Sequence, residues 1–135
     1  YLLFNRLTPD ANEVCFLSRS GPLRVTREGD VLELDFPAQP PVPVPMPAGL
    51  DTALSVMPLE YLMSGNRSVV VLESESQIRA LAPDMAAVAT LAPGGLLVTA
   101  PGDRHDFVSR YFAPSKGIPE DPVTGSAHTA STPYW

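Results

Sequence analysis

The spacing of apolar and polar residues predicts that the chain opens with the end of a helix followed by a β-meander. Residues 1–7 are apolar at helical spacings, which indicates the last turns of a helix. Residues 14–20 are predicted to form a strand. In residues 23–26 and 32–36, apolar and polar side chains alternate on either side of a turn at Gly29, which is typical of half-buried antiparallel strands.

The rest of the chain combines helical and strand patterns. The predicted helices are residues 50–56, which begin near Asp51 and Thr52, residues 74–81, and a segment that begins at Pro83-Asp84 and ends at residues 93–95. The predicted strands are residues 67–73, 96–99 and 106–112, whereas residues 57–63 fit either structure. Ser74 and Gln77 have the spacing of a helix capping box. With a final helix after residue 124, this order of elements predicts an α+β fold.

Proline is concentrated between these two parts of the chain. The 135 residues include 16 prolines, whereas average protein composition predicts about 7. Six of them lie in residues 37–47, which carry no charge and leave no room for a helix or a central strand. We expect an extended, polyproline-like segment that links two domains, although a long surface connection within one domain has the same pattern.

Composition and charge restrict the classes of partner and the location. The net charge is −6, which disfavours nucleic acids and anionic membranes as partners. No apolar run has the length of a membrane-spanning helix, and residues 1–6 lack the features of a signal peptide, so we expect a cytoplasmic location. Cys15 is the single cysteine, which excludes an internal disulfide and a cysteine-rich zinc site, and we expect its thiol to be buried in a strand.

The candidate chemistry lies near the C-terminus. Residues 122–135 carry no formal charge, which predicts a helix buried on all sides. The first turn of that helix would present the amides of Gly125, Ser126 and Ala127 together with the positive end of the helix dipole. Such an arrangement binds anions.

Two polar residues precede this turn. A carboxylate at the position of Asp121 can act as an acid, as a base, or as the group that orients a histidine. Thr124 is the expected N-cap residue, and the spacing equally allows that Asp121 and Thr124 only cap the helix. We expect His128 to be a hydrogen-bonded core residue. Because His105 lies in a separate polar turn, the two histidines do not predict a metal site.

A longer pattern surrounds these residues. It consists of DFVSRYFAP in residues 106–114 and GIPEDPVTGSAH in residues 117–128, followed by PYW at the end of the chain. This pattern closely resembles the PhzF-like proteins of phenazine biosynthesis. Upstream, RSGPL in residues 19–23 and LDFPAQPP in residues 34–41 resemble the middle region of the same family, so the resemblance spans nearly the whole chain.

The resemblance implies a fold similar to that of diaminopimelate epimerase. Such proteins have two related α+β halves, each a curved mixed or antiparallel sheet wrapped around a central helix, with the active site between the halves. They are cofactor-independent isomerases or epimerases, commonly homodimers, that move a proton on a small carboxylate-bearing metabolite. On this basis residues 1–36 are a remnant of the first half, residues 37–47 a Pro-rich linker, and residues 48–135 the nearly complete second half.

The resemblance also implies roles for individual residues. Asp121 would assist proton movement, and Ser126 would hold a substrate carboxylate with its hydroxyl and with the amides of Gly125 and Ser126. Asp121 and Ser126 are thus the expected catalytic residues, and Thr124, Gly125, Ser126 and Ala127 the expected substrate-binding residues.

Two family motifs of the first half do not occur in this sequence. They are a Glu-Thr-Ala-Phe motif that supplies the catalytic glutamate, and a Cys-Gly-His-Ala-Thr motif. We therefore expect an internal piece of a longer isomerase that is inactive alone. The alternative is a non-catalytic domain that binds small acids or another protein. An amino-acid epimerase fits less well, because such enzymes use paired cysteines and this sequence contains one.

Overall fold

The computed structural model describes residues 1–19 and 21–135, which form two compact units. The first unit is Tyr1–Ala38 and the second is Gln39–Trp135. The Pro-rich residues from Gln39 onward therefore belong to the second unit. Within the described residues, no helix is long and apolar enough to cross a membrane.

The first unit is a three-stranded antiparallel sheet with a single turn of helix. Its elements are a π-helix at Leu3–Leu7, β1 at Glu13–Ser18, β2 at Gly21–Glu28 and β3 at Val31–Asp35, in the sheet order β1-β2-β3. The predicted helix end and meander are confirmed, while Ser20 of the predicted strand lies outside the described residues. Cys15 lies on β1 as expected, but it is exposed, which corrects the prediction of burial: every residue of β1 except the partly buried Val14 is exposed.

Arg27 joins the helical turn of this unit to its sheet. Its guanidinium group donates to the carbonyl oxygens of Phe4, Pro9 and Ala11 at 3.1, 2.6 and 3.3 Å. The same group lies 5.4 Å from the centre of the buried Phe4 ring. One side chain on β2 therefore fixes both the helical turn and the loop that follows it.

The second unit is built on a six-stranded sheet in the order β4-β5-β6-β7-β8-β9. Its strands are β4 at Val42–Pro43, β5 at Glu60–Ser64, β6 at Arg67–Val71, β7 at Leu96–Pro101, β8 at Phe107–Ala113 and β9 at Ile118–Asp121. β6 and β7 are parallel, and the other neighbouring strands are antiparallel. The sheet is thus mixed, and the helical segment between β6 and β7 supplies the crossover that a parallel pair requires.

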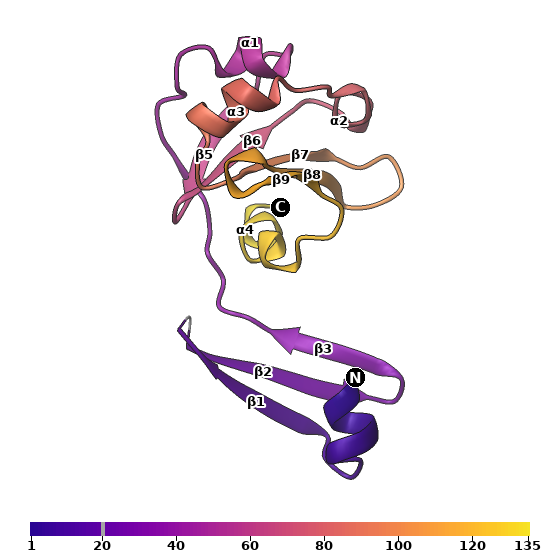
Figure 1. Cartoon of the computed structure of the whole chain (residues 1–135). Helices are drawn as coiled ribbons and strands as arrows, with labels where there is room; N and C mark the ends of the chain where they lie inside the picture. Colours follow the sequence, from indigo (N-terminus) through magenta and orange to yellow (C-terminus); the bar gives the residue numbers. More distant parts are fainter. Residues whose placement is uncertain (20) are drawn as a thin grey trace. The chain divides into compact units, whose positions relative to one another are not determined.

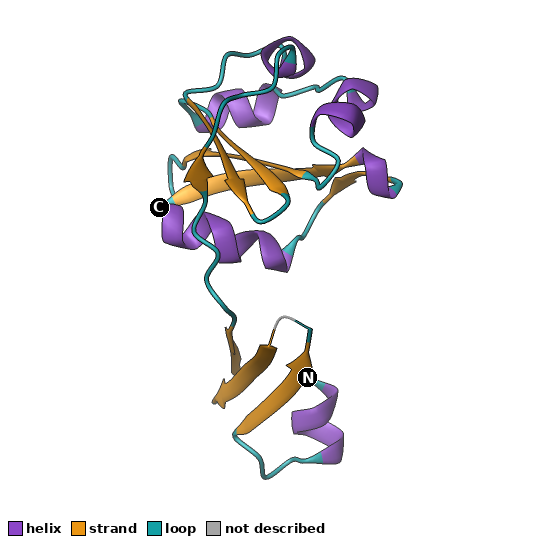
Figure 2. Cartoon of the chain, turned by 90° about the vertical axis from the view of Figure 1, so that its left-hand side faces the viewer, coloured by secondary structure: helices purple, strands orange, loops and turns teal. Residues whose placement is uncertain are grey.

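Helices cover both faces of this sheet (Figures 1 and 2). They are α1 at Leu50–Leu54, α2 at Glu75–Ala80 and α3 at Met85–Leu91 on one face, and α4 at His128–Tyr134 on the other. The strands alternate accordingly: Val70 packs in the cluster beneath α1, α2 and α3, whereas Val69 and Val71 pack with Ala127 and Ala130. The α+β fold is confirmed.

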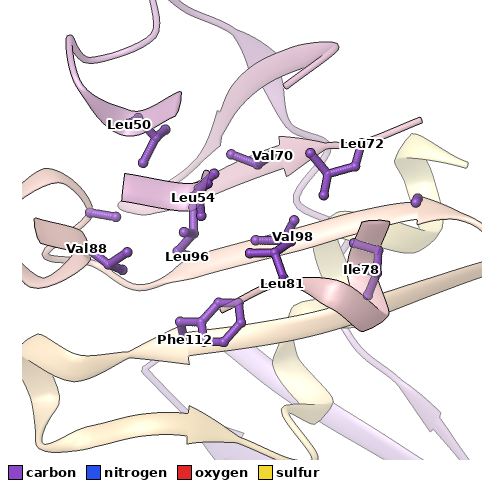
Figure 3. Close-up of a cluster of buried hydrophobic side chains, with 12 residues drawn as sticks. Leu50, Leu54, Val70, Leu72, Ile78, Leu81, Val88, Leu96, Val98 and Phe112 are labelled. Atoms are coloured by element: carbon purple, nitrogen blue, oxygen red, sulfur yellow. The ribbon is translucent and has the colours of Figure 1, made fainter. Parts of the chain in front are cut away.

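The larger hydrophobic cluster lies beneath the three helices (Figure 3). Leu54, Leu96 and Phe112 are each less than 2% exposed and come from a helix and two neighbouring strands. Leu50, Leu72 and Val98 are likewise almost wholly buried. Because each of these positions is apolar, burial of the cluster fixes which face of the sheet the helices cover.

Side-chain caps account for the beginnings of α2 and α3. The hydroxyl of Ser74 accepts from the Gln77 amide at 3.4 Å, as the capping box predicts, while the Gln77 side chain accepts from the amide of Glu73. Asp84 Oδ1 accepts from the amides of Ala86 and Ala87 at 2.9 and 3.1 Å. These local contacts explain why the starts of both helices were predicted from the sequence.

Three strands differ from the prediction. β5 occupies the segment that the pattern left undecided, β4 lies inside the Pro-rich stretch, and β9 lies in residues predicted to be a loop. β4 and β9 are the two edge strands of the sheet, and an edge strand tolerates proline because its outer N–H groups need no partner. α1 also begins at Leu50, one residue before the predicted start at Asp51.

The final helix has one buried face. Ala127, Ala130 and Ser131 are buried, whereas His128 and Thr132 are exposed. The prediction of burial on all sides is therefore wrong, because His128 and Thr132 face solvent. The helix is fixed to the sheet at its C-terminal end, where Trp135 Nε1 donates to Thr99 Oγ1 at 3.1 Å.

Tyr134 gives α4 a pH-dependent contact. Its hydroxyl donates to Glu60 Oε1 at 3.0 Å, and burial together with this carboxylate raises the pKa of Tyr134 from 10.0 to about 12. The fold thus favours the neutral phenol, and the resulting stabilisation is complete below pH 10 and lost as the pH rises towards 12. We expect a tyrosinate absorbance step near pH 12 that Tyr134→Phe removes. A step that persists near pH 12 in this variant would contradict the assignment.

Candidate functional site

Asp121 is the last residue of β9 and is held by the loop that follows it. In the β8–β9 register it lies opposite Tyr111. Its Oδ1 accepts from the amide of Val123 at 3.2 Å, and its Oδ2 accepts from the hydroxyl of Thr124 at 2.7 Å. Because the two donors bond to different oxygens, they fix the orientation of the half-buried Asp121 carboxylate.

The same contact corrects the predicted role of Thr124. Thr124 occupies the N-cap position of a 3₁₀ turn, Gly125–Ala127, which leads into α4, but its side chain accepts no bond from a backbone amide. Its hydroxyl donates to Asp121 instead. Neither Asp121 nor Thr124 therefore caps the helix in the expected way, because the two side chains bond within the loop.

The 3₁₀ turn leaves two adjacent amides available. The amide of Ala127 donates to the carbonyl of Thr124 at 2.9 Å, which corrects the expectation that three amides are free. Among the described residues, no acceptor bonds the amides of Gly125 or Ser126. Both residues are exposed. The predicted anion site is therefore narrower than expected and consists of two neighbouring N–H groups beside the Ser126 hydroxyl.

Arg67 also contacts this turn, a role that the sequence pattern did not predict. It is the first residue of β6, 59 positions before Ser126. Its Nη1 donates to the Ser126 carbonyl at 3.0 Å and its Nη2 to Ser126 Oγ at 3.1 Å. The contact is missed because it depends on the strand order, which brings the start of β6 beneath the turn.

A cavity of about 160 Å³ opens beside Asp121. Of the predicted site residues, Asp121, Thr124 and Ala127 line it, whereas Gly125 and Ser126 lie outside its wall. His128 also lines the cavity and is exposed, which corrects its expected place in the core. The centre of its ring is 6.1 Å from that of Phe107. The cavity therefore brings together a carboxylate, a hydroxyl and an imidazole.

An ion pair supports the strand that carries Asp121. Arg110 donates to both oxygens of Glu120 at 2.7 and 2.8 Å, and to the carbonyl oxygens of Ile78 and Leu81 at 3.0 and 2.7 Å. The hydrogen bonds from Arg110 lower the pKa of Glu120, and those same bonds raise the pKa of Arg110. Arg110 thus connects α2, β8 and β9, as expected for an arginine paired with an acid.

The arrangement suits acid–base chemistry on a bound anion. Asp121 and His128 are groups that can exchange a proton, and the free amides with Ser126 can hold a carboxylate beside them. In residues 1–19 and 21–135, no three His, Cys, Asp or Glu side chains gather closely enough to hold a metal ion. His105, in its separate polar turn, is exposed.

The sequence model of the phenazine biosynthesis-like protein family, PhzC-PhzF, matches residues 1–135. Two proteins of Pseudomonas aeruginosa named as uncharacterized isomerases are 49% and 47% identical over the whole chain, which covers 52% of each. A phenazine biosynthesis-like domain-containing protein of rat is 32% identical over 99% of this chain and 53% of its own length.

Solved structures of related proteins agree with the fold. A PhzF-family protein from Enterococcus faecalis is 39% identical, with a TM-score of 0.88 over 99% of this chain and 52% of its own. A phenazine biosynthesis PhzC/PhzF protein from Clostridium difficile is 33% identical, with a TM-score of 0.86 over 100% of this chain and 52% of its own. The chain thus spans about half the length of the relatives it matches. It belongs to the phenazine biosynthesis-like protein family.

Proposed function

We propose that this chain forms the Asp121–Ser126 side of the active site of a cofactor-independent isomerase, which moves a proton on a small carboxylate-bearing metabolite. The main support is the geometry of residues 121–126. The Asp121 carboxylate is oriented by two donors at the wall of a cavity, and the two free amides belong to Gly125 and Ser126, which follow the cavity-lining Thr124 in the chain. The names of the two P. aeruginosa relatives as isomerases agree with this reaction class.

The proposed reaction neither adds nor removes atoms. A C–H bond of the substrate breaks, its electron pair delocalises into the substrate, and a C–H bond forms at another carbon or on the opposite face. The proton leaves to a base and returns from an acid, so no oxidant or reductant is consumed. Asp121 assists the proton movement, while Ser126 and the amides of Gly125 and Ser126 hold the carboxylate.

The other side of the cleft completes this site in the proposal. The family resemblance assigns the base to a glutamate in a motif absent from this sequence, so the 135 residues alone are expected to be inactive. The full-length protein is proposed to be a cytoplasmic homodimer. The 135 residues carry a net charge of −6, which makes a small metabolite a better partner than nucleic acid or an anionic membrane.

Deuterium incorporation tests the proposed reaction. The full-length protein that carries these residues is incubated in D₂O with a panel of small monocarboxylates, dicarboxylates and aromatic acids, and the products are followed by NMR. Solvent deuterium should enter one carbon-bound position of at least one acid, and an isomer should appear. Acids that bind without exchange or conversion would instead identify a non-catalytic binding domain.

A further inference from the structure

Arg67 contacts the proposed carboxylate site at two points. One guanidinium group donates to both the backbone carbonyl and the side-chain oxygen of Ser126. The carbonyl of Ser126 also accepts from the hydroxyl of Thr129 at 2.8 Å. The turn that bears the free amides is therefore fixed from the sheet side by Arg67 and from the helix side by Thr129.

The charge of Arg67 is not neutralised by an acidic side chain. In the described part of the chain, the ion pairs involve Arg24, Arg79 and Arg110, and none involves Arg67. Its guanidinium carbon lies 5.6 Å from the centre of the Tyr111 ring, and its Nε is buried with no hydrogen-bond partner among the described residues. A half-buried cation without an acidic partner among the described residues thus contacts Ser126, which bears one of the two free amides.

The contact also sets the direction of the Ser126 hydroxyl. A guanidinium group donates hydrogen bonds and accepts none, so Ser126 Oγ must be the acceptor. The hydroxyl hydrogen is then directed away from Arg67 and is free to donate. In the proposed function, the hydroxyl of Ser126 and the two free amides all donate to a carboxylate oxygen of the ligand.

We propose that Arg67 is the positioning residue of this site, which orients Ser126 and supplies the positive charge that selects a carboxylate over a neutral group. This inference rests on the proposed function, since it assigns the carboxylate to Ser126. The expected effect of losing Arg67 is a change in selectivity. A carboxylate should bind about tenfold more weakly, because the positive charge near the ligand is lost, while a neutral ligand of the same shape is unaffected.

Benzoate and benzamide are suitable probes because they match in size and differ in charge. Each is titrated into the full-length protein, and binding is followed by NMR at the amides of Gly125 and Ser126. Arg67→Met should weaken benzoate about tenfold and leave benzamide unchanged. Arg67→Lys, which keeps the charge but not the two-point geometry, should recover only part of the preference.

Arg104→Met is the matched control. It removes the same charge from an exposed position in the turn after β7. Ser68, the neighbour of Arg67, pairs with Leu96 at the start of β7, so Arg104 lies beyond the other end of that strand. This variant should not change the affinity for benzoate or for benzamide. In a Ser126→Ala background, Arg67→Met should cost less than in the wild type, because the two residues act as a unit. If Arg67→Met does not fold, the affinities of Arg67→Lys for the two probes are compared with those of the wild type instead.

The outcomes separate this inference from the proposed function. Equal weakening of both probes, or no weakening of either, overturns the role of Arg67. If the wild type shows no preference for benzoate and Ser126→Ala does not alter turnover, the carboxylate site itself is wrong, and the proposed function fails with it.

Discussion

Replacing Asp121 by asparagine is expected to lower kcat of the proposed isomerase reaction at least about 100-fold in the full-length protein, because general acid–base groups contribute rate factors of this size. The substitution keeps the shape of the side chain but removes its ability to exchange a proton. It also leaves one oxygen to accept from the two donors, Val123 N–H and Thr124 Oγ1. KM is expected to change far less, since the proposal assigns the binding of the substrate carboxylate to Ser126 and the amides and not to Asp121.

The matched control for this prediction is Asp106→Asn. Asp106 is exposed next to the start of β8, and the same chemical change there should leave kcat and KM unaltered. Steady-state kinetics of both variants, with circular dichroism to confirm folding, make the comparison. Unchanged turnover in Asp121→Asn would show that another group moves the proton, and His128, which lines the same cavity, would then be the next residue to test.

Truncation of Leu96 to alanine should lower the free energy of unfolding by about 3 kcal/mol. Leu96 is fully buried on β7 beneath the helices of the larger cluster (Figure 3). The loss combines the transfer free energy of the removed methyl groups with the cost of the cavity left in the core. Against a typical stability of about 5–15 kcal/mol, this change is large.

Leu59→Ala supplies the control for the core variant. Leu59 is 64% exposed, so the same truncation should change the unfolding free energy by less than about 0.5 kcal/mol. Urea denaturation followed by the fluorescence of Trp135, the only tryptophan of the chain, measures both variants. Similar midpoints for the two variants would mean that Leu96 is not part of a packed core.

Local sequence patterns explain which elements were predictable. Ser74 and Asp84 cap their helices through neighbouring amides, so the starts of α2 and α3 could be inferred from a few adjacent residues. β9 could not, because Pro119 argues against a strand and because the pairing of β9 with β8 is set by the tertiary fold. The pattern of residues 57–63 was ambiguous because β5 is defined by its pairing with β4 and β6 and not by a local sequence pattern.

The residues of the candidate site also differ in whether they could be predicted from local sequence. The positions of Asp121 and Thr124 in one loop followed from their separation of three residues. The direction of the Thr124 hydroxyl did not, because a threonine before a helical turn has both an acceptor and a donor to offer. Arg67 was not predicted at all, since it lies 59 positions before Ser126 and no local pattern signals the contact.

The prolines of β4 and β9 have a consequence for whether another molecule can extend the six-stranded sheet. Pro43 lies on one outer strand of the six-stranded sheet and Pro119 on the other. A proline offers no N–H group to a further strand, so both borders of the sheet resist extension by another molecule and the aggregation that such pairing initiates. Two copies of the protein would therefore associate through side-chain surfaces, and a continuous sheet across the interface is not expected at either border.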